Sequence, residues 1–258
     1  MTGFTETHID INGIDTAVLL AGPGGSDNAP LVFFHGAGTA TGFDTLLPLA
    51  TDRQVVVAHH PGFGNSGDPA LTSAADLVRH HLDVLDHLGI VRFALAGQSM
   101  GGWLAATLAS FCTERITKLV LVCPAGLQSD EHPMTDLIAI PPEEVPSYLT
   151  ADLSVFGPPD AGPPPPEFLA ARAREAESAG VIFGNDPPGR STLKRWLHRI
   201  TVPTLVMWGD ADRMIPIGQA AEWAALLPTA IVKTFDGAGH LLFDERAEAA
   251  EVLAEFIR

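Results

Sequence analysis

The stretch from Arg92 to Gly102 reads RFALAGQSMGG, and it decides the fold. Arg92–Ala96 is a short apolar run typical of a buried strand, and Gly102–Phe111 is small and apolar nearly all round, as in a helix beneath a sheet. Between them, Gly97–Gly101 matches G-x-S-x-G, in which the serine sits on a strained strand-to-helix turn. The alternative is a glycine turn with an incidental serine, but the flanking strand and helix favour Ser99 as a nucleophile.

Short apolar runs bounded by Gly, Pro or Asp recur on both sides of this turn. They lie at Leu31–Phe34, Gln54–Ala58, Leu119–Cys123, Thr204–Trp208 and Ala230–Phe235. Amphipathic helical patterns lie among them at Ala74–Leu88 and Glu245–Ile257. This alternation predicts an α/β fold with a doubly wound, mostly parallel sheet and right-handed crossovers.

The segment 128–198 interrupts the alternation. It has no convincing strand pattern, and 12 of the 21 prolines lie between Pro133 and Pro188. It is too long for a plain linker, and it lies between two core strands. We therefore interpret it as a helical, proline-rich cap inserted into one α/β core, which is formed by residues 1–127 and 199–258.

Several elements are expected within this segment. Pro163–Pro166 predicts a stiff extended connector, because consecutive prolines favour polyproline geometry. Glu167–Ala179 predicts a surface helix with Phe168 and Leu169 as its apolar anchors, and Arg190–Ile200 predicts a further helix. For three aromatic residues of the chain a core role is favoured over a place in the substrate site: Phe156, Phe183 and Trp196.

Ser99 needs a base to accept its proton, because a serine hydroxyl is a weak nucleophile. Among ten histidines, His240 is the best candidate, since it follows the last predicted strand in a glycine-rich loop. The acid should lie at the end of the preceding strand, where Asp210 and Asp212 both occur. Asp212 is preferred because it leads into the loop Arg213–Pro216, and Asp210 is expected to brace the turn. The order serine, acid, histidine along the chain is the one used by enzymes whose nucleophilic serine lies on a G-x-S-x-G turn.

The oxyanion formed during attack needs two backbone N–H donors. Met100 follows the nucleophile and should supply one, and Ala37, in the glycine-rich loop after Leu31–Phe34, should supply the other. The residues expected to support the site are His35, Gly36, Gly97, Gln98 and Gly101. A phosphate cradle is the alternative for the Ala37 loop, but Gly36, Gly38 and Gly42 do not fit G-x-G-x-x-G, so no dinucleotide cofactor is expected.

Charge and composition exclude several other functions. The net charge of −16 disfavours nucleic acid and anionic membrane surfaces as partners. No signal peptide or membrane-spanning run is evident, so a cytoplasmic location is the default expectation. Cys112 and Cys123 are read as buried, reduced thiols. His59 and His60 lack further ligands at metal-site spacing, so no metal is expected, and a role in securing their loop is favoured.

These features together resemble the α/β-hydrolase superfamily over essentially the whole chain. Five landmarks occur in its order: His35-Gly36, Pro61–Ser66, Gly97–Gly101, Trp208–Pro216 and Gly239-His240. The second and third look like those of hydrolases that cleave the carbon–carbon bond of ring-fission products, and of related esterases. The resemblance implies an eight-stranded sheet, a helical cap after the sixth strand and no cofactor. Ser99 argues against epoxide hydrolases and haloalkane dehalogenases, which place aspartate at this turn.

The chain departs from the ring-fission hydrolases at several positions. Thr39-Ala40 follows Gly38 where they have Pro-Gly, Gln98 replaces an asparagine before the nucleophile, and Leu241 replaces a tryptophan after the histidine. Those enzymes also bind the substrate carboxylate with a cap arginine, for which Arg190 and Arg195 are the candidates here.

The leading hypothesis is a carboxylic ester hydrolase that forms an acyl-enzyme on Ser99 with a small or medium acyl substrate. Hydrolysis of carbon–carbon bonds, lactones or thioesters, and perhydrolysis, remain open with the same residues. A non-hydrolytic enzyme or a ligand-binding module on this fold is a less favoured alternative, because a fold alone does not fix function. The sequence leaves open whether the chain acts alone or as a homodimer.

Overall fold

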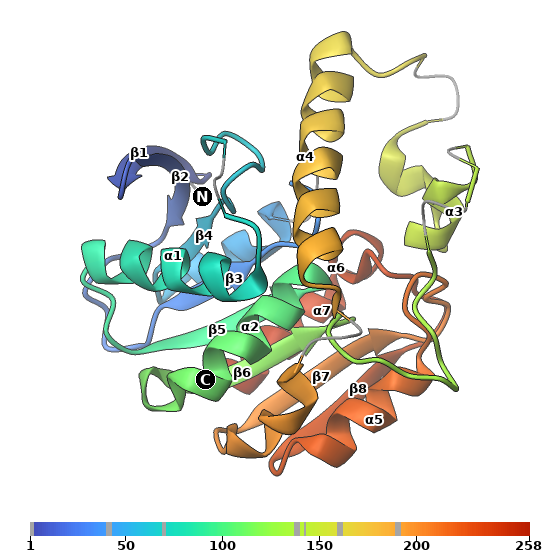
Figure 1. The fold of residues 1–258 in the computed structure, drawn as a ribbon. Coiled ribbons are helices and arrows are strands. Elements are labelled where there is room, and N and C mark those ends of the chain that lie inside the picture. Colours follow the sequence, from blue (N-terminus) through green and yellow to red (C-terminus); the bar gives the residue numbers. More distant parts are fainter. Residues whose placement is uncertain are drawn as a thin grey trace.

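One eight-stranded sheet forms the centre of the molecule, in the order β1-β2-β4-β3-β5-β6-β7-β8 (Figure 1). The computed structural model describes residues 3–39, 43–68, 71–136, 140–141, 143–158, 162–188 and 192–258. The strands are β1 (Thr5–Ile11), β2 (Ile14–Ala21), β3 (Leu31–Phe34), β4 (Val55–Ala58), β5 (Phe93–Gln98), β6 (Ile116–Val122), β7 (Thr204–Gly209) and β8 (Ala230–Phe235). Only the pairings of β2, with β1 and β4, are antiparallel. The predicted α/β class and mostly parallel sheet are therefore confirmed.

β1 carries no continuous apolar run, β2 has one at Ala17–Ala21, and only the resemblance implied these two strands. They form a hairpin through Asn12 and Gly13, whose φ angles of 55° and 84° are both positive. An Asn-Gly pair suits such a two-residue turn, because both residues tolerate the left-handed region. Most residues of β1 are exposed or half-buried, so its sequence does not need apolar side chains and shows little hydrophobic pattern.

Helices cover the sheet and connect its strands. The helical elements of the core are η1 (Asp44–Thr51), α1 (Ala74–His87), α2 (Met100–Phe111), η2 (Thr113–Arg115), α5 (Gly218–Leu226), α6 (Leu242–Glu245) and α7 (Glu248–Ile257). α1 packs on α2, α5 contacts β7 and β8, and α7 contacts η1. The closing helix expected over Glu245–Ile257 begins three residues later, at Glu248, because Arg246 adopts an extended conformation between α6 and α7.

Between β6 and β7 the described residues contain helices and turns but no strand. They comprise α3 (Val145–Leu149), η4 (Leu153–Phe156), α4 (Pro166–Asn185), η6 (Thr192–Arg195) and η7 (Leu197–Arg199). α3 and α4 rise from the same end of the sheet (Figure 1). The helix expected over Arg190–Ile200 consists of 3-10 turns from Thr192 onward, and residues 190 and 191 lie outside the described part.

The anchors predicted for α4 are wrong. Phe168 and Leu169 are 40% and 52% exposed. The helix begins at Pro166, after Pro165 with the extended angles φ −57° and ψ 147°, and it continues six residues beyond the predicted end. Its buried side chains are those of Glu175, Ser178, Ala179 and Ile182. The inner face of α4 therefore carries mostly polar or small side chains. The sequence has no stripe of large apolar residues there that would mark it as buried.

The three aromatic residues expected in the core have different environments. Phe183 packs on Trp103 with ring centroids 6.3 Å apart, as a core role requires. Trp196 and Phe156 are 46% and 48% exposed, so the core role is wrong for both.

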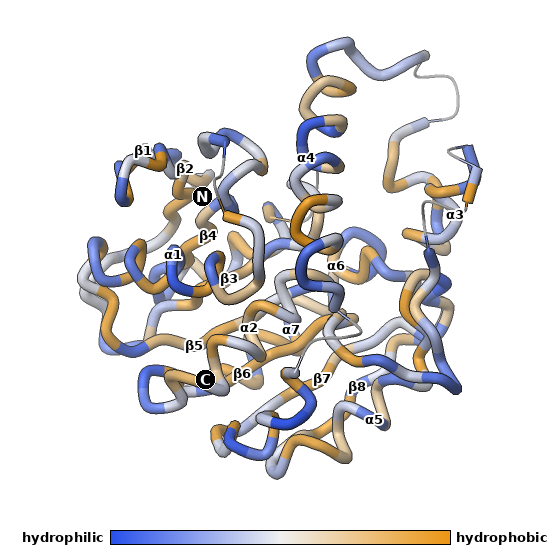
Figure 2. Tube along the Cα trace, viewed as in Figure 1, coloured by the Kyte–Doolittle hydropathy of each residue, from blue (hydrophilic) through white to orange (hydrophobic). Residues whose placement is uncertain are grey.

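The core lies on both sides of the parallel strands, and the hydrophobic colours of Figure 2 concentrate there. α2 is buried along nearly its whole length and contacts β3, β5 and β6. Glycine permits this close approach: a Cβ at Gly101 would overlap the backbone carbonyls of Phe34 and His35, and one at Gly97 would overlap Gly101. Among the described residues, no helix has the length and apolar character needed to cross a membrane.

Gly101→Ala should lower the free energy of unfolding by about 3 kcal/mol, because backbone must move to accept the methyl group. Gly180→Ala is the matched control, since Gly180 lies in α4 with no atom within 4 Å of a Cβ. There alanine should raise the free energy of unfolding by about 0.5–1 kcal/mol through its helix propensity. Chemical denaturation of both variants measures this, and a Gly101→Ala protein as stable as wild type would contradict the packing.

Candidate active site

Ser99 occupies a sharp turn between β5 and α2. Its φ of 55° and ψ of −119° lie outside the usual regions for a residue with a side chain, and such a conformation costs on the order of 1–3 kcal/mol. The surrounding backbone holds it: the N–H of Ser99 donates to Val122 O at 2.9 Å, and its carbonyl accepts from Ala125 N at 3.0 Å. The side chain is only half-buried and borders a cavity, as a nucleophile requires.

His240 and Asp212 form a buried pair beside Ser99. The Nδ1 atom of His240 lies 2.8 Å from Oδ2 of Asp212, and both residues are less than 10% exposed. Oδ1 of Asp212 accepts the N–H groups of Met214 at 2.8 Å and Ile215 at 2.9 Å. These bonds fix the carboxylate, which in turn favours a proton on Nδ1 and leaves Nε2 of His240 as the acceptor.

The carboxylate of Asp210 is not hydrogen-bonded to His240 and binds a loop instead. Asp210 is exposed, and its Oδ1 accepts the N–H of Gly237 at 2.6 Å. The structure therefore joins His240 to Asp212, while Asp210 ties together the two loops that carry the pair.

Cys123, directly after β6, lies next to the Asp212–His240 pair. It is buried with a φ of 42°, and its Sγ lies within 4.8 Å of ligand atoms of Asp212 and His240. This is the one group of three in the described residues that could hold a metal ion. Burial and the nearby Asp212 charge raise the pKa of the Cys123 thiol, which favours a protonated side chain facing the carboxylate.

The two predicted oxyanion donors lie on α2 and on the loop after β3. Met100 is the first residue of α2, where the helix dipole favours negative charge. Ala37 lines the same cavity as Ser99, and a Cβ on Gly36 would lie 3.4 Å from Ser99 Cβ, so this loop passes directly beside the serine. Gln98 supports the site from behind, since its Nε2 donates to the carbonyl of His240 at 2.9 Å.

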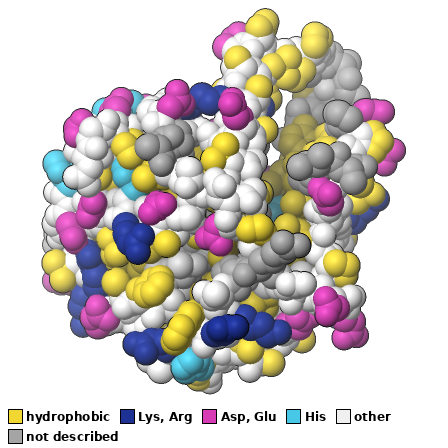
Figure 3. Space-filling model, in the orientation of Figure 1, with side chains coloured by type: hydrophobic (Ala, Val, Ile, Leu, Met, Phe, Trp, Pro, Cys, Tyr) yellow, Lys and Arg dark blue, Asp and Glu magenta, His cyan; other side chains and the backbone are white. Residues whose placement is uncertain are grey.

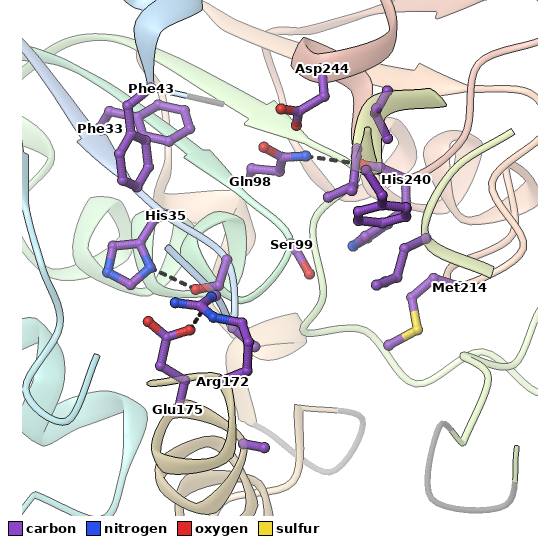
Figure 4. A pocket seen from close by; sticks show the side chains of 18 of the residues that line it. Phe33, His35, Phe43, Gln98, Ser99, Arg172, Glu175, Met214, His240 and Asp244 are labelled. Carbon is purple, nitrogen blue, oxygen red and sulfur yellow. Dashed lines mark hydrogen bonds and ion pairs between the residues drawn. The ribbon is translucent and has the colours of Figure 1, made fainter. Parts of the chain in front are cut away.

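A cavity of about 510 Å³ opens in front of these residues. Its apolar lining consists of Phe33, Phe43, Leu149, Val155, Phe156, Phe168, Met214 and Leu241. Figure 4 shows Ser99 and His240 on one side of this space and Arg172 and Glu175 of α4 on another. Figure 3 shows the surface hollowed beside α4. The arrangement can hold an apolar group against the serine.

Comparison with known proteins identifies the family of this chain. The model of the alpha/beta hydrolase family matches residues 31–255. The chain belongs to this family. It is 31% identical to the poly(3-hydroxyalkanoate) depolymerase of Ectopseudomonas oleovorans, over 99% of this chain and 92% of that protein. It is 30% identical to a 2-hydroxy-6-oxononadienedioate/2-hydroxy-6-oxononatrienedioate hydrolase of Burkholderia vietnamiensis, over 91% and 88%.

Solved structures of alpha/beta hydrolases share the fold. A bacterial membrane phospholipase A superposes with a TM-score of 0.81 and 25% identity, over 98% of this chain and 86% of that one. The meta-cleavage product hydrolase of Pseudomonas fluorescens superposes with a TM-score of 0.78 and 22% identity, over 97% and 96%.

The arginine in the cavity of this alpha/beta hydrolase is Arg172, which sequence analysis missed. Of the two arginines considered, Arg195 is exposed and does not line the cavity, and residue 190 lies outside the described part. Arg172 stacks over the ring of Phe168 at 5.4 Å and forms an ion pair with Glu175. The sequence places Arg172 and Glu175 three residues apart on one helix face, but it carries no sign that Glu175 is buried.

Glu175 fastens α4 to two loops of the core. It is only 1% exposed, and its carboxylate accepts the hydroxyl of Thr39 at 2.6 Å and the N–H of Gly64 at 2.9 Å. Since Thr39 follows Ala37 by two residues, this carboxylate also fixes the far side of the loop after β3.

A cluster of buried histidines lies behind that loop. His60 donates its backbone N–H to Nε2 of His35 at 2.9 Å, and Nδ1 of His59 accepts the N–H of Asn65 at 3.1 Å. His81 of α1 joins them through Nδ1 of His60 at 2.6 Å. Burial lowers the pKa of each of these histidines, that of His60 to about 3.

Acid should therefore destabilise the fold below about pH 6.5. The four histidines stay neutral in the folded chain, whereas in the unfolded chain they bind protons near their ordinary pKa of 6.5. Unfolding then takes up protons, so stability is full above pH 6.5 and falls as the pH drops, by up to about 1.4 kcal/mol per histidine and pH unit. Urea unfolding at pH 7.5 and 5.5 measures the difference.

Two histidine variants distinguish the source of this dependence. His81→Gln should make the loss between pH 7.5 and 5.5 smaller, because it removes one buried imidazole. His87→Ala, on the exposed side of the same helix, should leave the loss as it is. Equal stability of the wild type at the two pH values would contradict the neutral cluster.

Proposed function

We propose that this alpha/beta hydrolase cleaves carboxylic esters through an acyl-enzyme on Ser99. The observation that carries the proposal is the buried His240–Asp212 pair, bonded at 2.8 Å, whose histidine lines the same apolar cavity as Ser99. A hydrogen-bonded base beside a strained, partly exposed serine is the arrangement that activates a hydroxyl for attack.

The reaction proceeds in two halves. Ser99 Oγ attacks the ester carbonyl carbon while Nε2 of His240 takes its proton, and Asp212 stabilises the imidazolium. The N–H groups of Ala37 and Met100 bind the oxyanion. When the tetrahedral intermediate collapses, the alcohol leaves with the proton from His240 and the acyl group stays on Ser99. Water then attacks this ester, again with His240 as the base, and releases the acid and the free serine.

The proposed substrate is neutral, with a small or medium apolar acyl group. A cavity of about 510 Å³ lined by aromatic and aliphatic side chains suits such a group. Its charged lining residues are Arg172, Glu175 and Asp244, so one cation stands against two carboxylates. The name of the Ectopseudomonas relative, a depolymerase of a polyester, is consistent with an ester substrate. In this proposal the segment between β6 and β7 acts as a cap over the substrate.

Carbon–carbon hydrolysis of a ring-fission product is the second candidate. The similarity to the Burkholderia hydrolase and the position of Arg172 in the cavity favour it. However, Arg172 is already paired with the buried Glu175, and a substrate carboxylate would have to compete for it. Leu241 lines the cavity where the ring-fission hydrolases carry tryptophan. Both points favour the ester.

Asp212→Asn should lower kcat for p-nitrophenyl butyrate by about 10³–10⁴-fold, because the amide no longer holds His240 in the useful tautomer. Asp210→Asn is the control: it alters a carboxylate two residues away that binds only a loop N–H, and kcat should stay within about threefold. Ser99→Ala should abolish turnover. Equal losses in the two aspartate variants would contradict the assigned acid.

The charge of the acyl group separates the two candidate functions. We expect kcat/KM for methyl p-nitrophenyl glutarate to exceed that for mono-p-nitrophenyl glutarate by about tenfold, since burying the free carboxylate beside Glu175 is unfavourable. The two esters have the same acyl chain and differ in the charged end. A preference for the acid would instead support a carboxylate-binding cavity and the ring-fission reaction.

A further inference from the structure

Three buried histidines connect α1 to the loop beside Ser99. His35 follows β3, His60 follows β4 and His81 lies in α1, and each is at most 1% exposed. The rings of His35 and His60 stack with centroids 3.8 Å apart, and Nδ1 of His60 lies 2.6 Å from Nε2 of His81. The proposed reaction uses none of these side chains directly. We call the three residues the histidine network.

The partners of each ring determine which nitrogen carries its proton. Nε2 of His35 accepts the backbone N–H of His60, so its proton lies on Nδ1 and is donated to the carbonyl of Gly36 at 2.7 Å. Nε2 of His60 faces the carbonyl of His35 at 2.9 Å and must donate to it. Nδ1 of His60 is then an acceptor, and Nε2–H of His81 donates to it. A neutral imidazole has one donor and one acceptor, and this assignment uses both in His35 and His60.

The hydrogen bond from Nδ1–H of His35 to the carbonyl of Gly36 fixes the peptide group between Gly36 and Ala37. The carbonyl of Gly36 and the N–H of Ala37 belong to the same planar unit, in which they point in opposite directions. Holding the carbonyl toward His35 therefore directs the N–H of Ala37 the other way. Ala37 and Ser99 line the same cavity, and Gly36 passes directly beside the serine.

We propose that His35, His60 and His81 are positioning residues of the hydrolysis, which hold the N–H of Ala37 in the orientation that binds the oxyanion. This inference rests on the proposed function, because an oxyanion forms only in acyl transfer. It predicts that breaking the network far from the substrate, at His81, slows the chemical step without weakening substrate binding.

The surroundings keep the network neutral. The rings packed against it are those of Phe34, Phe43 and Phe63. The other titratable side chains facing it are His59 and His80. No carboxylate of the described residues is hydrogen-bonded to its three rings. A proton added to His60 would replace the acceptor at Nδ1 by a second donor and break the contact with His81.

The adjacent His80 provides a matched control. It lies on the same helix, is 5% exposed, and bonds through Nε2 to Thr16 Oγ1 at 3.0 Å rather than to the network. Replacing it removes a buried imidazole and its hydrogen bond while leaving the bonds toward Gly36 in place.

The first test reads the network without any substrate. In ¹⁵N-histidine-labelled protein, NMR should show His35 protonated at Nδ1 and His60 and His81 protonated at Nε2, with no titration between pH 6 and 9. The opposite tautomer at His35 or His60, or a histidine of the network that titrates in this range, would overturn the proposal.

The second test measures hydrolysis of p-nitrophenyl butyrate. His81→Leu should lower kcat by about tenfold or more, part of the 10²–10³ that one oxyanion donor supplies, with KM within about twofold. His81→Gln should restore most of kcat, because its amide nitrogen can reach the position of Nε2. His80→Leu should keep kcat within about twofold. Equal kcat losses in His81→Leu and His80→Leu, or a change in KM alone, would overturn the positioning role.

A replacement variant and a comparison of the two tests separate a failure of the network from a failure to fold or of the proposed function. If His81→Leu does not fold by circular dichroism, His81→Asn replaces it, since its amide ends near the position of Nδ1 and cannot reach His60; the same loss of kcat is expected. A wild type that shows the assigned tautomers but hydrolyses no ester would contradict the proposed function, whereas an active wild type with other tautomers would contradict the network alone.

Discussion

The backbone at Ser99 is the constraint on which the rest of the site depends. With φ at 55°, this residue can be held only by neighbours that fix both sides of the turn. Val122 of β6 and Ala125 in the loop after it do so through backbone hydrogen bonds to Ser99. Gly97 and Gly101 let α2 approach β5 and β3 without a Cβ between them. The same close approach brings the loop after β3 beside the serine. The position of the nucleophile and that of one oxyanion donor thus follow from a single packing requirement.

Buried polar side chains then determine how the loops around the turn are held. Asp212 orders the loop after β7 while it orients His240, and Glu175 ties α4 to the loops after β3 and β4. Each of these carboxylates is buried and has several donors, as a buried charge requires. Arg172 is the one lysine or arginine among the described residues that line the cavity, and Glu175, its ion-pair partner, would compete with an acidic substrate for it. The preference proposed here for a neutral ester follows from this pairing.

Much of the fold could be predicted from the sequence, because strands buried on both faces leave continuous apolar runs. The turn at Ser99 and the loops of Asp212 and His240 could also be located, since each follows such a run. The β1–β2 hairpin could not, because β1 is largely exposed, although Asn12-Gly13 marks its turn. The role of α4 was missed for another reason: it contacts the core through Glu175 and small residues, so its inner face resembles a surface in the sequence.

Labelling with a fluorophosphonate tests most directly whether Ser99 is activated. This reagent bonds to a serine only where a base and oxyanion donors activate it. The purified protein and its Ser99→Ala variant would be compared by intact mass. We expect one adduct on the wild type and none on the variant. An unlabelled wild type, or equal labelling of both proteins, would contradict an activated Ser99.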